Sequence, residues 1–251
     1  MVAALALLAL YYRRRAQIAR YARANVSTPD DQRQAAFALA ASIFTGVGRR
    51  NKDPHFLSRL LAPLGPSPVA VLSQGGCCSG IHRLFITALD TLGIASAQIT
   101  VLRRVAPALA HCLVQVQVGD TSYLIDADYG VWLHDGQGRP LSLVDLQRGV
   151  VPVIEPFVAD GVARYVGSDR SRPPGFPDRE YYRFDYELTR TANWAEGPIR
   201  RIAYCVLKPL TRGGIDRLLL PPALEWPELL LAGTLCALAL TMLVATQALT
   251  I

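Results

Sequence analysis

The chain has 251 residues and a formal net charge of +6, and 51% of its residues are apolar. This length allows one sizeable core plus appendages, and the apolar excess over an average soluble domain lies at the two ends. The basic residues are scattered or crowd those ends, which argues against nucleic-acid binding, and five cysteines without a CxxC pair argue against a disulfide framework or a structural zinc site.

The two apolar ends indicate a membrane protein. Residues 2–10 are wholly apolar, but a full span needs about 20 residues, so this run is a shortened span, an interfacial anchor or a frayed terminus. Residues 229–251 carry no charge and can cross a bilayer with some tilt, the alternative being a buried core helix. Trp226 is expected at the membrane interface. Arginines follow the first run and precede the second, so the positive-inside rule places the domain between them in the cytoplasm.

The central domain begins with a predicted helix. Thr28 can cap it, Pro29 fits its first position, and apolar residues then recur on one face up to Gly46. A second short helix is predicted at residues 56–61, and residues 65–68 are predicted to form a loop.

A cysteine-bearing helix and a β-hairpin follow. The segment Gly-Gly-Cys-Cys-Ser-Gly at 75–80 leads into an apolar pattern of helical period that Gly93 ends, so Cys78 lies at the start of a helix. Residues 119–120 are predicted to be the tight turn between two strands. The predicted strands are 97–105, 112–118 and 121–125.

The region after residue 150 is less informative. Residues 168–180 are rich in proline, glycine, arginine and aspartate and are predicted to be a loop. Residues 180–186, Glu-Tyr-Tyr-Arg-Phe-Asp-Tyr, are predicted to be an aromatic strand that can cover a cleft.

Three residues carry a candidate thiol chemistry. A helix N-terminus favours the thiolate of a cysteine such as Cys78, and a cysteine nucleophile also needs a histidine partner and an acceptor that orients that histidine. His111 opens one strand, and Asp126, 15 residues later, closes the next. Adjacent antiparallel strands can bring such a pair together at one end of a sheet. The predicted catalytic residues are therefore Cys78, His111 and Asp126.

The order of these motifs resembles the transglutaminase-like superfamily, which has a papain-like fold. The resemblance spans roughly residues 70–130, and Leu113, Gln115 and Tyr123 depart from the residues common in that family. It implies a Cys-His-Asp triad. Some family members use calcium, but this chain has no dense acidic loop for it and no nucleotide motif, so no cofactor or metal is expected. The motifs are Gly-Cys-Cys at 76–78, Thr-Leu-Gly-Ile at 91–94, His-Cys-Leu-Val-Gln-Val at 111–116 and Tyr-Leu-Ile-Asp-Ala-Asp-Tyr-Gly at 123–130.

Other residues near the triad have alternative interpretations. Cys77 is the competing nucleophile, but it lies one position out of register with Gly93. Gln74 lies where papain-like enzymes place an oxyanion donor. His82 can line the cleft or simply pack in the core. Cys112 is predicted to be a small core residue, whereas His55 and His134 have no evident partners.

These interpretations combine into one expected organisation. A short apolar anchor and basic stretch (1–27) precedes an α+β papain/transglutaminase-like core with helices packed on an antiparallel sheet (28–150). An extension (151–220) and a transmembrane helix (228–251) follow. The expected activity is that of a membrane-anchored cysteine hydrolase or acyltransferase acting on a protein, a peptide or another amide. The alternatives are an arylamine N-acetyltransferase-like enzyme, echoed by Gly-Gly-Cys-Cys at 75–78, and a non-catalytic membrane scaffold.

Overall fold

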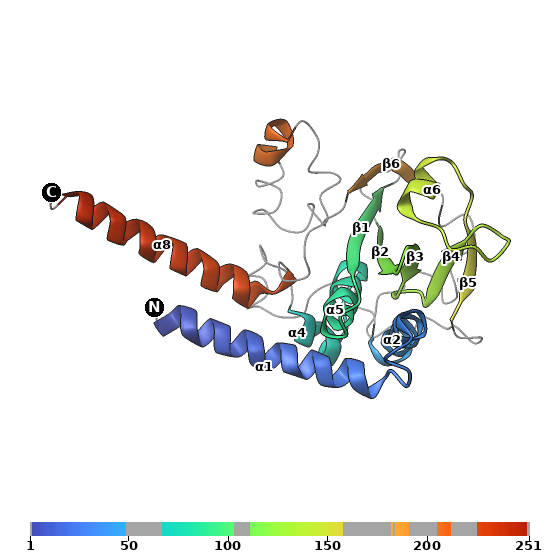
Figure 1. The fold of residues 1–251 in the computed structure, drawn as a ribbon, viewed down its shortest axis with the longest axis horizontal. Helices are drawn as coiled ribbons and strands as arrows, with labels where there is room; N and C mark the ends of the chain where they lie inside the picture. Colours follow the sequence, from blue (N-terminus) through green and yellow to red (C-terminus); the bar gives the residue numbers. More distant parts are fainter. Residues whose placement is uncertain are drawn as a thin grey trace.

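The computed structural model describes residues 2–48, 67–102, 111–157, 182, 184–190, 205–211 and 225–249. It is an α+β structure in which helices pack on an antiparallel sheet, as predicted, and two long helices project to one side (Figure 1). The helices are α1 (Val2–Ala24), α2 (Gln32–Gly46), α4 (Pro68–Gln74), α5 (Cys78–Thr91), α6 (Leu143–Gln147) and α8 (Pro227–Leu249). The strands are β1 (Ser96–Leu102), β2 (His111–Val118), β3 (Thr121–Asp126), β4 (Val131–His134), β5 (Val153–Pro156) and β6 (Asp185–Arg190).

The sheet has the strand order β5-β4-β3-β2-β1-β6, and every neighbouring pair is antiparallel. The predicted hairpin is β2–β3, in which Val118 pairs with Thr121 across the two-residue turn. This short turn sets the register, so Val114 lies opposite Ile125. Strands β5 and β6 lie at the two edges, so residues from the 151–220 extension complete the sheet of the core.

The two faces of the sheet are both covered. Alternate residues of β2 point to opposite sides, with Val114 and Val116 facing the helical core and Leu113 facing the second core. Helices α1, α2, α4 and α5 supply the first core, whereas Leu146 of α6 and Tyr182 contribute to the second. Because both faces are covered, consecutive residues of the middle strands are buried, as in residues 111–114 of β2 and 123–126 of β3.

The first core helix starts later than predicted. Helix α2 begins at Gln32, and its N-cap is Asp31, whose side chain accepts a hydrogen bond from the Gln34 backbone N–H. The predicted start at Thr28 and Pro29 is therefore wrong by three residues. Aspartate is a favoured N-cap residue. The helix that follows it contains the buried residues Ala35 and Ala36.

The next helix was not predicted. Ser67 caps α4 by accepting from the Ala70 N–H, and Pro68 occupies its first turn, so residues predicted to be loop begin a helix. The predicted helix at 56–61, His55 and the predicted loop at 168–180 lie outside the described residues. The first predicted strand ends within the described chain at Leu102, and its remaining predicted residues are likewise outside it.

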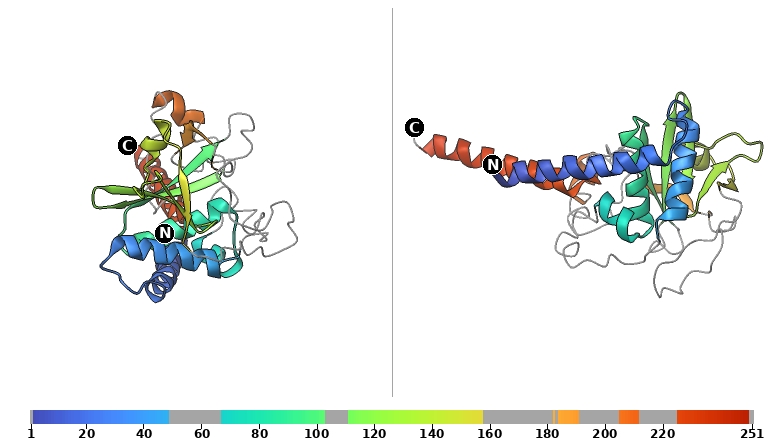
Figure 2. Two further views of the ribbon diagram at one scale, coloured as in Figure 1. Left: turned by 90° about the vertical axis from the view of Figure 1, so that its right-hand side faces the viewer. Right: turned by 90° about the horizontal axis from the view of Figure 1, so that it is seen from below.

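The terminal helices run side by side away from the sheet (Figures 1 and 2). Helix α1 continues without a break through the arginines at 13–15, so the predicted anchor and the predicted basic stretch form one helix. In α8, Glu228–Thr246 is 19 residues long and is the only stretch of the described chain long and apolar enough to cross a membrane. Residues 233–246 of this stretch are all exposed, as expected for a surface that faces lipid.

The base of α8 is held by the domain. Trp226, expected at a membrane interface, is instead 1% exposed and packs edge-on against Tyr11, with ring centroids 5.4 Å apart. Glu228 pairs with Arg14 of α1. One residue before Trp226, Glu225 accepts a 2.7 Å hydrogen bond from buried Arg83 of α5. The apolar helix is thus connected to α5, the helix that carries Cys78.

Candidate active site

Cys78 is the first residue of α5, as predicted, and a glycine loop sets its position. The backbone N–H of Gly76 donates to the Gly48 carbonyl at 3.1 Å. Gly75 has a φ of 80°, and a Cβ at this position would lie 2.0 Å from the same carbonyl oxygen. Only glycine fits both the backbone conformation and this close approach. The loop therefore packs against Gly48, and this contact fixes the point at which α5 begins with Cys78.

Replacing Gly75 with alanine is expected to destabilise the protein by about 3 kcal/mol or more, because the methyl group meets backbone that cannot rotate away. Gly93→Ala is the matched control: Gly93 has a φ of 73°, but nothing lies within 4 Å of its Cβ position. It should cost only the backbone strain, about 1 kcal/mol. Urea unfolding of both variants measures the difference, and equal losses would contradict the close packing against residue 48.

His111 and Asp126 meet at one end of the hairpin. His111 is the first residue of β2 and Asp126 the last of β3, and the register Val114–Ile125 brings these two strand ends together. His111 Nε2 lies 2.6 Å from Asp126 Oδ2, and both side chains are buried. The predicted histidine–carboxylate pair is therefore formed.

Cys78 lies beside this pair. One ligand atom each of Cys78, His111 and Asp128 lies within 4.8 Å of the other two. Because Nε2 of His111 is used by Asp126, Nδ1 is the ring nitrogen that can take the thiol proton. The structure thus brings together all three predicted catalytic residues, from α5, β2 and β3.

Asp126 is the most heavily hydrogen-bonded member of the site. Its Oδ1 accepts the backbone N–H groups of Asp128 at 3.0 Å and Tyr129 at 3.1 Å. Its Oδ2 accepts the hydroxyl of Tyr182 at 2.6 Å in addition to the His111 ring. These donors satisfy a carboxylate that is fully buried and fix its orientation toward His111.

His82 belongs to the site, although sequence reasoning left it between a cleft residue and a packing residue. It lies one turn after Cys78 on α5, is 0% exposed, and its Nδ1 donates to the Cys78 carbonyl at 2.6 Å. Its Nε2 lies 3.3 Å from Asp126 Oδ1. His82 therefore connects the backbone of the cysteine to the carboxylate that holds His111.

Two aromatic residues of the 180–186 segment, Tyr182 and Phe184, contact Asp126 and His111. Tyr182 is buried in a turn, and Phe184 stacks on His111 with ring centroids 6.2 Å apart and an interplanar angle of 13°. The strand itself, β6, starts only at Asp185. An aromatic segment beside the site was predicted, but the bond from Tyr182 to Asp126 spans 56 residues and had no local signal.

Charge and burial shift the pKa values of Cys78, His111 and Asp126. Burial alone would lower the pKa of His111, but the charge and hydrogen bond of Asp126 outweigh it and raise that pKa to about 9. Burial would also raise the pKa of Asp126, yet His111, and then His82, hold it well below its usual range. The neighbouring Cys112 sulfur and burial raise the pKa of the Cys78 thiol, against a lowering by His111. Burial and Cys112 thus act against the lowering expected from the helix N-terminus.

The remaining candidates lie around this centre. Gln74 is the last residue of α4, and its role as an oxyanion donor stays a prediction. Cys77 is the N-cap of α5, and its sulfur lies 3.2 Å from the Ser79 hydroxyl. Cys112 is buried, as predicted, and accepts from the Gln98 amide at 3.2 Å. His134, which had no predicted partner, lies 3.5 Å from Glu155.

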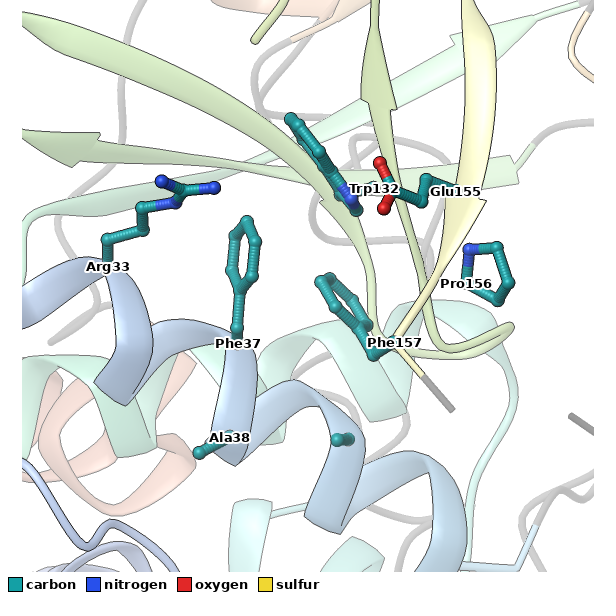
Figure 3. Close-up of a pocket in the computed structure, with 8 residues that line it drawn as sticks. Arg33, Phe37, Ala38, Trp132, Glu155, Pro156 and Phe157 are labelled. Atoms are coloured by element: carbon teal, nitrogen blue, oxygen red, sulfur yellow. The ribbon is translucent and has the colours of Figure 1, made fainter. Parts of the chain in front are cut away.

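A cavity of about 410 Å³ lies elsewhere, between α2 and strands β4 and β5 (Figure 3). Phe37, Trp132 and Phe157 form its aromatic wall, with Arg33 and Glu155 on either side of them. None of its lining residues is Cys78, His111 or Asp126, so this cavity is separate from the thiol site.

No protein family, curated protein or solved structure matches the chain. The functional argument therefore depends on the geometry of the site.

Proposed function

We propose that this chain is a membrane-anchored thiol enzyme that acts on amide or other acyl bonds through Cys78, His111 and Asp126. The observation that carries the proposal is the convergence of a cysteine, a histidine and a buried carboxylate from three different elements. A nucleophile, a base and an acceptor that orients the base are the groups that thiol acyl chemistry needs. A scaffold would be as stable with apolar residues in place of the buried charged pair.

In the first step, the neutral form of His111, whose fraction rises as the pH approaches its pKa of about 9, takes the thiol proton of Cys78 at Nδ1. The sulfur attacks the acyl carbon, a carbon–sulfur bond forms, and the carbonyl electron pair moves to oxygen. The first N–H groups of a helix have no partner within it, so the N–H of Cys78 can donate to this oxyanion, with Gln74 as the proposed second donor. Because Asp126 stabilises the imidazolium, His111 is a stronger base than an exposed histidine.

In the second step, the tetrahedral intermediate collapses. The carbon–oxygen double bond re-forms, and the leaving group departs with the proton from His111 and leaves a thioester on Cys78. Water or an amine then gives a proton to His111 and attacks the thioester, and the Cys78 thiolate leaves and recovers that proton. Water makes the enzyme a peptidase or amidase, whereas an amine makes it an acyltransferase.

The proposed fold family is the papain-like, transglutaminase-like one. Its support is a cysteine at the start of a helix that packs on an antiparallel sheet whose neighbouring strands carry the histidine and the aspartate. The order of motifs in the sequence agrees with this proposal.

The proposed location is a membrane, with the catalytic domain on the cytoplasmic side. Helix α8 supplies the span, and the apolar start of α1 runs beside it. Arg13, Arg14 and Arg15 lie on α1 where that apolar start ends, on the domain side of the apolar segments. A cytoplasmic domain satisfies the positive-inside rule for these arginines and keeps Cys78 reduced.

An activated ester tests the chemistry without knowledge of the natural substrate. Full-length protein in detergent is mixed with p-nitrophenyl acetate, and the expected result is a burst of nitrophenol close to one equivalent per chain, followed by slow turnover. Mass spectrometry should place the acetyl group on Cys78. Cys78→Ala should abolish the burst, and an added alkylamine that accelerates the slow phase would indicate transfer rather than hydrolysis.

Cys205→Ala provides the matched control, because Cys205 is an exposed thiol outside the site. Its removal should leave the burst intact. If Cys78 is acylated no faster than Cys205, or if the burst persists in Cys78→Ala, the thiol-enzyme proposal is wrong.

A further inference from the structure

Cys78, His111 and Asp128 together offer one sulfur, one nitrogen and one oxygen ligand atom, all within 4.8 Å of one another. In a tetrahedral zinc site the bonds are about 2.0–2.3 Å long, so the ligand atoms lie roughly 3.3–3.8 Å apart. A side-chain rotation that moves the most distant atoms by about 1 Å would close the three around a single ion. The backbone already converges, because the residues lie at the start of α5, at the start of β2 and in the turn after β3.

The surroundings of His111 suit a metal as well as a thiol. A histidine that binds zinc usually donates its other ring N–H to a carboxylate, which fixes the ring and strengthens the ligand. Asp126 accepts that bond from Nε2 at 2.6 Å, so Nδ1 faces the metal position. The Asp128 N–H donates to Asp126 Oδ1, so the same turn positions the outer carboxylate and the carboxylate ligand.

The donor set selects the class of ion. Calcium and magnesium require oxygen ligands, whereas a thiolate with an imidazole favours zinc among the common cellular metals. Three protein ligands leave the fourth position of a tetrahedral ion to water. Because the three ligand atoms already lie within 4.8 Å of one another, the set needs side-chain movement alone.

We propose that Zn²⁺ binds reversibly to Cys78 Sγ, His111 Nδ1 and an Asp128 carboxylate oxygen, and inhibits the enzyme. Sulfur binds as the thiolate and its proton is released to solvent. The ion then binds the electron pair of Cys78 Sγ that would attack the acyl carbon and the pair of His111 Nδ1 that would accept the thiol proton. Binding follows from the geometry alone, and the inhibitory consequence rests on the proposed thiol chemistry.

Zinc affinity tests the ligand set. Full-length protein in detergent, stripped with EDTA, is titrated with ZnCl₂ against a chromogenic chelator. Wild type should bind one ion per chain, and Asp128→Asn should weaken binding by on the order of 100-fold. Asp120→Asn, an exposed carboxylate in the β2–β3 turn, is the matched control and should bind as wild type. Equal affinities of Asp128→Asn and wild type would overturn the proposal.

Protection of the thiol tests the same site without relying on a folded variant. Zinc should slow alkylation of the Cys78 peptide in wild type, as followed by mass spectrometry, and should leave the Cys205 peptide unaffected. Zinc that binds without protecting Cys78 would show that the ion lies elsewhere, and the proposal would fail.

The ester burst separates this proposal from the proposed function. Zinc should suppress the burst in wild type, and the concentration needed for half suppression should rise in Asp128→Asn. If metal-free wild type shows no burst but still binds zinc through Asp128, the thiol-enzyme proposal fails and the zinc site stands. Faster ester cleavage by the zinc-loaded protein would overturn the inhibitory role.

Discussion

Asp126→Asn is expected to slow acylation of Cys78 by p-nitrophenyl acetate by about 100-fold or more. Asparagine nearly matches aspartate in shape, so it can still accept the N–H groups of Asp128 and Tyr129. It loses the negative charge that stabilises the His111 imidazolium. Its amide can also donate to Nε2, which would move the ring proton to Nδ1 and prevent that nitrogen from accepting the thiol proton. The burst rate under single-turnover conditions measures this loss.

Two companion variants show whether the loss arises at His111. Tyr182→Phe removes one donor to Asp126 while the charge stays, so its burst should slow by only a few fold. Asp120→Asn changes an exposed carboxylate and should have no effect. A folded Asp126→Asn protein that reacts as fast as wild type would exclude Asp126 from the catalytic arrangement. Thermal unfolding of each variant identifies a misfolded protein.

The positions of Cys78, His111 and Asp126 in their elements were predictable because the signals are local. The glycines before Cys78 and the helical period after it predicted the start of α5, and alternating apolar residues on both sides of a two-residue turn predicted β2 and β3. Since a two-residue turn leaves one register, the meeting of His111 and Asp126 followed from the hairpin. The His111–Asp126 contact requires only the two strands of this hairpin.

The partners of the triad were harder to predict because their contacts are long-range. His82 shares its helix with Cys78, but its position beside Asp126 depends on how α5 packs on the sheet. Tyr182 follows β5 in the chain and is 56 residues from Asp126, to which its hydroxyl donates. The tuning of Cys78 was also missed, because the buried Cys112 sulfur raises the thiol pKa more strongly than His111 lowers it.

Short elements explain the missed parts of the fold. Strands β4 and β5 have four residues each and helix α4 has seven, which is too few for a periodic pattern to stand out. At α2, the sequence favoured Thr28 as the cap, whereas Asp31 accepts from the Gln34 N–H and the helix begins at Gln32. Trp226 resembled an interfacial residue in sequence, but the contact with Tyr11 of α1 places it inside the domain.

Glu225→Ala is expected to destabilise the protein by about 3–5 kcal/mol. Arg83 is 0% exposed, and its Nε donates to Glu225 Oε2 at 2.7 Å, so removal of the carboxylate takes a negative charge away from a buried guanidinium. We expect the substitution to destabilise α5 in particular, because Arg83 lies on the helix that carries Cys78. Urea unfolding in detergent measures the free-energy change, and the ester burst reports on the site.

An exposed ion pair that also involves α5 is the control. Arg15 of α1 and Asp90 of α5 are 3.2 Å apart, but each side chain is 39% exposed. Asp90→Ala should therefore cost about 0–1 kcal/mol, because solvent replaces the lost interaction. Similar losses for Glu225→Ala and Asp90→Ala would contradict the burial of the first pair.

The double variant Arg83→Met/Glu225→Leu separates charge from packing. It removes both buried charges and keeps apolar volume, so it should recover most of the stability lost by Glu225→Ala. If the double variant is as unstable as the single one, the unbalanced charge of Arg83 is not the cause of the loss. If it is stable but has a slower burst, the Arg83–Glu225 bond serves to position α5, and the apolar helix then influences the thiol site through this contact.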